Sequence, residues 1–143
     1  MKDSASLMFE WRSIRLKLKD GLTEDNLQEM TDWFFSLNPS VHGFNYDDMK
    51  TWPDIWRYIS EEFYTESGNG LGMFYTLVHA DYKPELWLIH DLYHSDIYLV
   101  CIIDDYVLNR KSGKVEKLSE VRSDLDVLEK HTSDNVMETI KFN

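Results

Sequence analysis

The chain has 143 residues, of which 43% are hydrophobic and 14% aromatic, and its formal net charge is −11. This length fits one core, so we expect a single globular domain over residues 1–143. The aromatic content excludes a disordered chain, and no apolar run reaches the roughly 20 residues that a membrane-spanning helix needs.

The negative charge is concentrated in the middle of the sequence. Residues 22–109 hold three basic and sixteen acidic side chains. Such a field repels phosphate backbones and attracts basic surfaces, so we expect a basic protein partner, which could itself be a nucleic-acid-binding protein, and no direct binding of nucleic acid. An acidic surface that serves solubility alone is the simpler alternative.

The first half of the chain reads as one strand and two helices. Residues 13–19, SIRLKLK, alternate apolar and polar side chains, as expected of a strand with one buried face. Residues 22–39 predict a helix that Thr23 caps and Asn38-Pro39 ends. Residues 40–50 read as a loop, and residues 51–64 as a second helix with Pro53 in its first turn.

The second half of the chain is predicted to be richer in strands. The sequence SGNG, residues 67–70, interrupts the pattern before LGMFYTLVHA, which is either a strand or, as its length favours, a helix. A short helix is expected around residues 123–130, and the end of the chain is ambiguous. Strands are expected at residues 86–90, 97–103 and 106–109, with a shorter one near Val115.

Helices grouped first and strands grouped second indicate an α+β fold, with helices packed on one face of a small, mainly antiparallel sheet. Residues 97–103 are apolar at nearly every position, as in a central strand buried on both faces. Cys101 lies in this stretch, so we expect a buried thiol rather than a nucleophile. It also cannot form an intramolecular disulfide. No N-terminal stretch has the pattern of a secretion signal, and we expect a cytoplasmic protein.

The histidines of the central stretch raise the question of a metal site. His90 and His94 alternate with Asp91 and Asp96, but the segment breaks between two strands and its spacing matches no zinc pattern. Turn residues with local hydrogen bonds are the simpler interpretation. We therefore expect no metal and no cofactor.

Residues 66–109 contain a further pattern, marked by Ser67, His94 and Asn109. A Gly-containing loop opens a helix, a histidine stands before a central strand, and a carboxylate or amide closes the next strand. This pattern is similar to the core of transglutaminase-like and papain-like cysteine hydrolases. Those families place a cysteine at the start of the helix, whereas this chain offers only Ser67, Gly68 or Asn69. The resemblance implies either a hydrolase that uses Ser67 or Cys101 with His94 and Asn109, or a relic that has lost hydrolysis.

The leading hypothesis from the sequence is a non-enzymatic binding or inhibitory protein that docks on a basic protein surface. Phage host-takeover proteins, anti-defence proteins, immunity proteins and nucleic-acid mimics share this composition. Aromatic rings beside carboxylates supply contact area and electrostatic steering. The candidate binding residues lie between positions 44 and 66 and are Tyr46, Asp47, Asp48, Trp52, Asp54, Glu61, Glu62 and Glu66.

Overall fold

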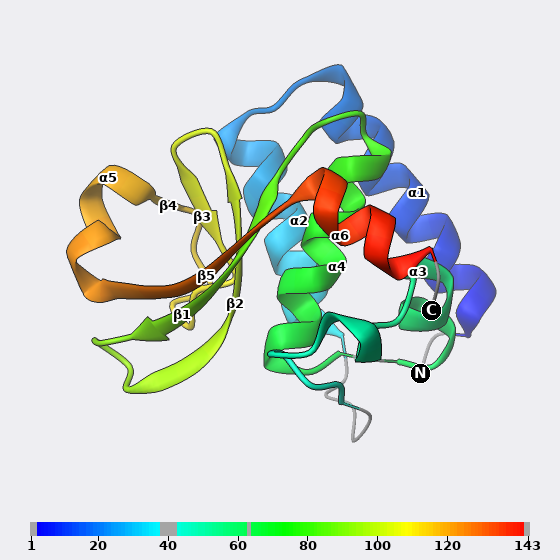
Figure 1. The fold of residues 1–143 in the computed structure, drawn as a ribbon. Helices are drawn as coiled ribbons and strands as arrows, with labels where there is room; N and C mark the ends of the chain where they lie inside the picture. The colour runs from blue at the N-terminus through cyan, green and yellow to red at the C-terminus, as the bar shows by residue number, and fades with distance from the viewer. Residues whose placement is uncertain (1–2, 38–42, 63, 142–143) are drawn as a thin grey trace.

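A computed structural model describes residues 3–37, 43–62 and 64–141, and it combines helices with one five-stranded sheet (Figure 1). The α-helices are α1 (Ser4–Asp20), α2 (Glu24–Ser36), α3 (Ile55–Ser60), α4 (Glu66–His79), α5 (Leu118–Val121) and α6 (Ser133–Ile140). Two 3-10 helices are η1 (Met49–Thr51) and η2 (Arg122–Asp124). The strands are β1 (Glu85–Asp91), β2 (Asp96–Ile103), β3 (Tyr106–Leu108), β4 (Glu116–Lys117) and β5 (Leu125–Thr132).

The predicted strand at residues 13–19 is wrong, because these residues belong to α1. Asp3 caps this helix by accepting a hydrogen bond from the Ser6 backbone N–H at 2.8 Å. Its buried side chains, three or four residues apart, form a helical stripe. These side chains are Leu7, Trp11, Ile14 and Leu18.

The helix predicted after Gly21 is confirmed as α2. The Thr23 side chain accepts a hydrogen bond from the Asn26 backbone N–H at 3.1 Å, as expected of a cap. Leu27, Met30 and Phe34 point into the core with less than 2% of their surface exposed. The predicted loop over residues 40–50 is described from residue 43 onward, where it leads into η1.

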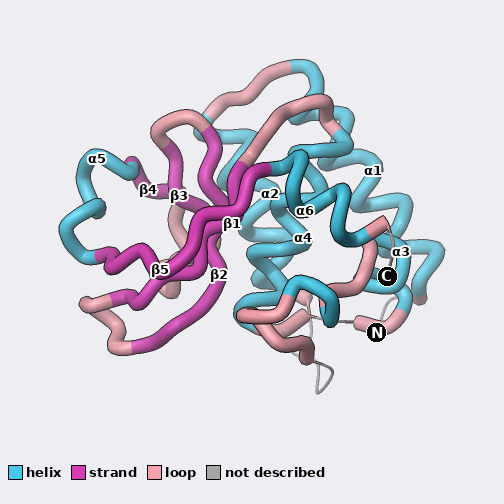
Figure 2. Tube along the Cα trace, viewed as in Figure 1, coloured by secondary structure: helices cyan, strands magenta, loops and turns pink. Residues whose placement is uncertain are grey.

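The sheet has the strand order β4-β3-β2-β1-β5, and every neighbouring pair is antiparallel. The predicted strands at 86–90, 97–103 and 106–109 correspond to β1, β2 and β3, which confirms them. Figure 2 shows these strands between the main group of helices and the short α5 segment. The α+β class is therefore confirmed.

Both faces of β2 are buried, as the sequence predicts for a central strand. Leu99 and Cys101 pack in the core that the large helices share, whereas Tyr98 and Val100 pack in a second, smaller cluster. The α5 segment closes that smaller cluster with Val121. Because helices cover mainly one face, the opposite face depends on this short segment for its burial.

The predicted helix at residues 123–130 is wrong, because β5 occupies most of this range. It pairs with the free edge of β1 and carries an irregularity in register between Leu88 and Ile89. The ambiguous end of the chain forms α6, which Thr132 caps by accepting from the Asn135 backbone N–H at 3.2 Å. Within the described ranges, each helix is too short or too polar to cross a lipid bilayer.

Candidate functional site

The SGNG sequence lies inside the first turns of α4 and is not a loop that precedes a helix. Thr65 caps α4 by accepting from the Gly68 backbone N–H at 3.1 Å. Gly70 is needed because a Cβ atom there would lie 2.6 Å from the Leu99 carbonyl oxygen. The favoured helical interpretation of LGMFYTLVHA is confirmed.

Ser67 and Asn109 meet at the backbone of Leu99 in β2. The Ser67 Oγ accepts from the Leu99 N–H at 3.3 Å, and the Asn109 side-chain amide donates to the Leu99 carbonyl at 2.9 Å. The same amide donates to the Glu66 carbonyl at 2.7 Å. Since the pairing of β3 with β2 begins only at Cys101, these two side chains take the place of a strand neighbour at Leu99.

His94 belongs to a different group of residues. It lies in the turn between β1 and β2, and its Nδ1 is 2.7 Å from the Asp91 Oδ2. The same carboxylate oxygen accepts from the Tyr98 hydroxyl at 2.5 Å. The Asp91 Oδ1 accepts from the backbone N–H groups of Tyr93 and His94 at 3.1 and 3.2 Å.

Arg110 completes this network. It is 3% exposed, its Nη2 lies 3.3 Å from the Asp91 Oδ1, and its Nη1 lies 3.1 Å from the Glu116 Oε2. Burial alone would raise the pKa of Asp91, but the hydrogen bonds from Tyr98 and His94 and the nearby guanidinium hold it well below its usual range. Asp91 is therefore a fully buried, ionised carboxylate.

Among the described residues, no hydrogen bond joins Ser67, His94 and Asn109, the three residues that the hydrolase resemblance selects. A general base must lie within hydrogen-bond reach of the nucleophile that it activates. Over the residues that the structure describes, the hydrogen bonds of His94 go to Asp91, and those of Ser67 and Asn109 go to the β2 and α4 backbone.

Cys101 is also placed unfavourably for chemistry. The side chain is 0% exposed inside β2, and burial raises the pKa of its thiol. A buried thiol of this kind is protonated at neutral pH and is a poor nucleophile. The position agrees with a small core residue.

An ion cluster lies beside Ser67, where the first turn of α4 meets the start of β2. The Lys111 Nζ is 2.8 Å from the Asp96 Oδ2 and 3.4 Å from the Glu66 Oε1. Its hydrogen bond with Asp96 raises the pKa of Lys111 and lowers that of Asp96. Glu66, proposed from the sequence as a binding residue, is therefore already paired with a lysine.

The other candidate binding residues between positions 44 and 66 fall into two groups. The rings are largely used in packing, since Trp52 is 1% exposed and Tyr46 packs against the core. The carboxylates of Asp47, Asp48, Asp54, Glu61 and Glu62 lie on the surface. Asp54 caps α3 by accepting from the Arg57 backbone N–H at 2.8 Å, and Glu61 pairs with the Arg57 side chain at 3.1 Å. Trp56, at 50% exposure, supplies the accessible ring that was expected of Trp52.

Sequence reasoning missed the buried network of Asp91, Tyr98 and Arg110. The only local pattern in the sequence that points to this network is Asp91 at the last position of an apolar strand, followed by a turn that contains His94. The pairing with Arg110 joins positions 19 residues apart and has no sequence signature. Within the described part of the chain, no three His, Cys, Asp or Glu side chains are grouped so that they could hold a metal ion.

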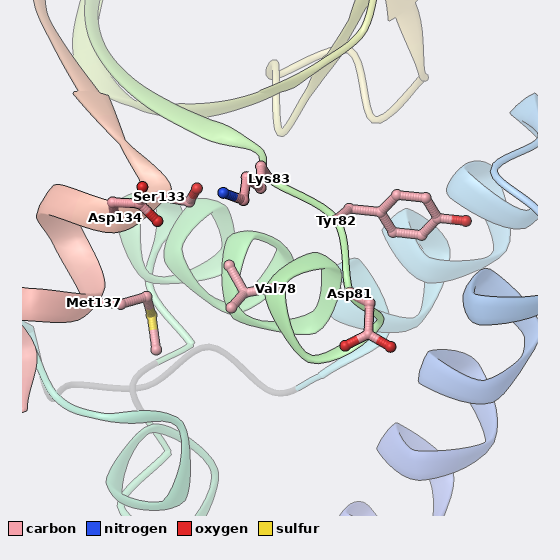
Figure 3. A pocket seen from close by; sticks show the side chains of 7 residues that line it. All are labelled: Val78, Asp81, Tyr82, Lys83, Ser133, Asp134 and Met137. Atoms are coloured by element: carbon pink, nitrogen blue, oxygen red, sulfur yellow. The ribbon is translucent and has the colours of Figure 1, made fainter.

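A separate hollow of about 300 Å³ lies between the end of α4 and the start of α6 (Figure 3). Val78 and Met137 form its apolar wall, and Lys83 lies near Ser133 and Asp134 at its rim. Lys83 is exposed to solvent, so the hollow is an open surface feature rather than an enclosed site.

Comparison of the sequence with protein-family models and with curated protein sequences gives no match. The structure, in contrast, is similar to that of LapG from Legionella pneumophila. The calcium-bound form of LapG aligns with a TM-score of 0.70 and 16% identity over 91% of this chain and 76% of that one. The chain shares its fold with LapG.

Two further LapG structures agree with this result. One aligns with a TM-score of 0.68 and 15% identity over 91% of this chain and 75% of that one. The EGTA-treated form aligns with a TM-score of 0.67 and 15% identity over 91% of this chain and 74% of that one. All three alignments therefore support a fold that this chain shares with LapG.

Proposed function

We propose that the protein is a relic of a transglutaminase-like hydrolase that has lost hydrolysis and acts by binding. The observation that carries this proposal is the placement of His94. Its ring is held by Asp91, while Ser67 and Asn109 are engaged at the Leu99 backbone. A LapG-like fold supplies the scaffold, but these three side chains stabilise the structure instead of forming a nucleophile and its base.

The hydrolytic alternative is tested with a fluorophosphonate probe, which labels activated serines, and with iodoacetamide, which labels reactive thiols. We expect the folded protein to react with neither at a rate above that of an exposed, unactivated side chain. Ser67→Ala is compared with the exposed control Ser60→Ala. Rapid, stoichiometric labelling that disappears only in Ser67→Ala would establish an active serine and reject the proposal.

The partner that we propose is a protein with a basic surface. The chain carries a net charge of −11, and the stretch between positions 47 and 66 has exposed carboxylates and the half-exposed ring of Trp56. Charged groups in this arrangement accelerate encounter with a positive surface, and an accessible aromatic ring contributes contact area. Inhibition of that partner is one consequence that such docking would have.

The proposed role of charge in binding is tested in three steps. Partner proteins are captured from the native host, identified by mass spectrometry, and each purified candidate is titrated with this protein. The variant Asp47→Asn, Asp48→Asn, Glu61→Gln, Glu62→Gln should weaken binding, most strongly at low salt. The matched control neutralises four exposed carboxylates elsewhere, Asp20→Asn, Glu120→Gln, Asp126→Asn and Glu138→Gln. Equal affinity of the two variants, or affinity independent of salt, would exclude this binding surface.

A further inference from the structure

A pocket of about 240 Å³ lies beside the Asp91 network, and we name it the His94 pocket. The turn between β1 and β2 supplies Tyr93 and His94, and the segment after β3 supplies Arg110 and Glu116. Val121 and Asp124 close it from the α5 and η2 side. It is distinct from the acidic stretch at positions 44–66.

The walls of the pocket are fixed in place by hydrogen bonds. The Leu92 backbone N–H donates to the Asp124 carbonyl oxygen at 2.8 Å, which joins the turn to η2. On the other wall, Arg110 contacts Asp91 and Glu116 together. A pocket with preorganised walls binds a ligand at a smaller entropic cost than one that must be assembled.

Asp91 determines which nitrogen of His94 is available to a ligand. An ionised carboxylate can only accept hydrogen bonds, so the 2.7 Å contact requires the proton on the Nδ1 of His94. In the neutral ring, the Nε2 is then a hydrogen-bond acceptor. Over the described residues, this atom has no hydrogen-bond partner, and the ring lines the pocket.

The charges of the pocket favour a positively charged ligand. The guanidinium of Arg110 is already shared between Asp91 and Glu116. The half-buried Asp124 adds a third carboxylate, and within the described residues its side chain has no hydrogen-bond or ion-pair partner. An anion would meet an excess of negative charge, whereas a cationic donor would satisfy two acceptors at once.

Arg110 gives a second and independent indication of a ligand. Its Nε is buried and has no hydrogen-bond partner in the described part of the chain. Buried donors of this kind are rare, and an acceptor oxygen from a bound water or a ligand would explain this one.

We propose that the His94 pocket binds a primary ammonium group, which donates hydrogen bonds to the Nε2 of His94 and to the carboxylate of Asp124. Two sources carry this group, the amino terminus of a peptide and the side chain of lysine. The amino terminus also has a carbonyl oxygen three bonds from the cationic nitrogen, and the unpartnered Nε of Arg110 favours it. A serine hydrolase site is not implied, because the Ser112 hydroxyl at the pocket donates to Glu116 at 3.1 Å and not to His94.

The proposal is tested by nuclear magnetic resonance titration of the full chain at neutral pH. The probes are glycinamide for an amino terminus, Nα-acetyl-lysine amide for a lysine side chain, neutral N-acetylglycinamide, and acetate. We expect glycinamide to cause saturable shifts of the Tyr93, His94 and Asp124 amide signals. Saturation by the lysine probe as well would extend the ligand class to any primary ammonium group.

Substitutions locate the binding atoms. Asp124→Asn keeps the shape of the side chain but removes its charge, and we expect affinity for glycinamide to fall at least about tenfold, as for loss of a charge-assisted hydrogen bond. His94→Phe should have a similar effect. The control Asp126→Asn makes the same change at an exposed position two residues away and should leave affinity unchanged.

Three outcomes would overturn the proposal. The first is the absence of saturable shifts with both ammonium probes. The second is binding of acetate or N-acetylglycinamide as tightly as glycinamide. The third is unchanged affinity of Asp124→Asn for glycinamide. Each result can be obtained whether or not the protein is a hydrolase relic, because the pocket contains neither Ser67 nor Asn109.

Discussion

The side-chain amide of Asn109 donates to the carbonyl oxygen of Leu99, 2.9 Å away, and to the Glu66 carbonyl. One side chain therefore joins the end of β3, the middle of β2 and the first turn of α4. Asn109 has a φ of 75°, a left-handed conformation that asparagine tolerates better than most residues. Asn109, which the resemblance assigns as a catalytic amide, thus connects three elements of the fold through its hydrogen bonds.

Asn109→Asp should destabilise the protein by roughly 2–4 kcal/mol at neutral pH, since the carboxylate cannot donate and faces two carbonyl oxygens. The cost should shrink in acid, where a protonated carboxyl can donate again. Urea unfolding at several pH values measures both effects. Asn135→Asp is the control, because residue 135 is exposed and lies in the first turn of α6, where a negative charge is tolerated. A cost equal to that of the control would refute the structural role of Asn109.

Gly72 and Gly70 permit α4 to approach its neighbours. A Cβ at Gly72 would lie 2.5 Å from the Phe34 ring, and one at Gly70 would lie 2.6 Å from the Leu99 carbonyl oxygen. We expect Gly72→Ala to lower the free energy of unfolding by about 1–3 kcal/mol despite the better helix propensity of alanine. Gly70→Ala should cost more, because its nearest contact is backbone.

The glycine prediction is measured by thermal and urea unfolding, with Gly21→Ala as the control. A Cβ at Gly21 would have its nearest contact at an ordinary 3.8 Å, and its φ of −175° suits any residue. We expect this control to change stability by less than about 0.5 kcal/mol. If Gly70→Ala and Gly72→Ala were as stable as the control, α4 would not pack against its neighbours as closely as the structure shows.

The sequence identifies the central strands and α2 because each of these carries a long and regular pattern. The stretch at 13–19 misleads because Ile14, Leu16 and Leu18 alternate over a short window. Only Ile14 and Leu18 are buried, and Leu16 is 48% exposed. The helical period becomes visible when the window is extended back to Leu7 and Trp11.

The error at β5 has a different origin. Residues 125–132 have no strong strand pattern, and most of their side chains are exposed. They form a strand because β1 has a free edge whose backbone groups need partners, which β5 supplies along its length. Such tertiary pairing overrides local propensity and cannot be predicted from the segment alone.

The candidate site was predictable only in part, for the same reason. The order of helix, turn histidine and strand-end amide gives the right topology, and the structural similarity to LapG agrees with it. The direction of the His94 side chain is decided by Asp91, Tyr98 and Arg110, which are brought together by folding. Sequence spacing carries no information about such a direction.

The burial of Cys101 leads to a prediction about its reactivity. In the native protein, 5,5′-dithiobis(2-nitrobenzoic acid) should label Cys101 far more slowly than in 6 M guanidinium chloride, because the side chain is 0% exposed. Conditions or substitutions that destabilise the fold should accelerate labelling in proportion to the population of open molecules. Fast labelling under native conditions would show that β2 is not a stable central strand.

The Asp91 network predicts a pH-dependent contribution to stability. The folded state lowers the pKa of Asp91 below the value of about 3.9 in an unfolded chain, so the unfolded state binds the proton more tightly. The stabilisation from this carboxylate is complete above about pH 4 to 5. This stabilisation is lost progressively as the pH falls below the pKa of Asp91 in the unfolded chain and approaches its lower pKa in the folded protein.

Asp91→Asn should therefore lower the free energy of unfolding by roughly 3–5 kcal/mol at pH 7, because Arg110 would remain buried without one of its two carboxylates. The difference from the natural sequence should narrow below about pH 4, where the wild-type carboxylate itself loses its advantage. Asp126→Asn, at an exposed position, should differ from the natural sequence by less than about 0.5 kcal/mol. Urea unfolding at pH 7, 5 and 3 measures all three proteins. A difference for Asp91→Asn that stayed constant down to pH 3 would mean that the ionised form of Asp91 does not hold this network together.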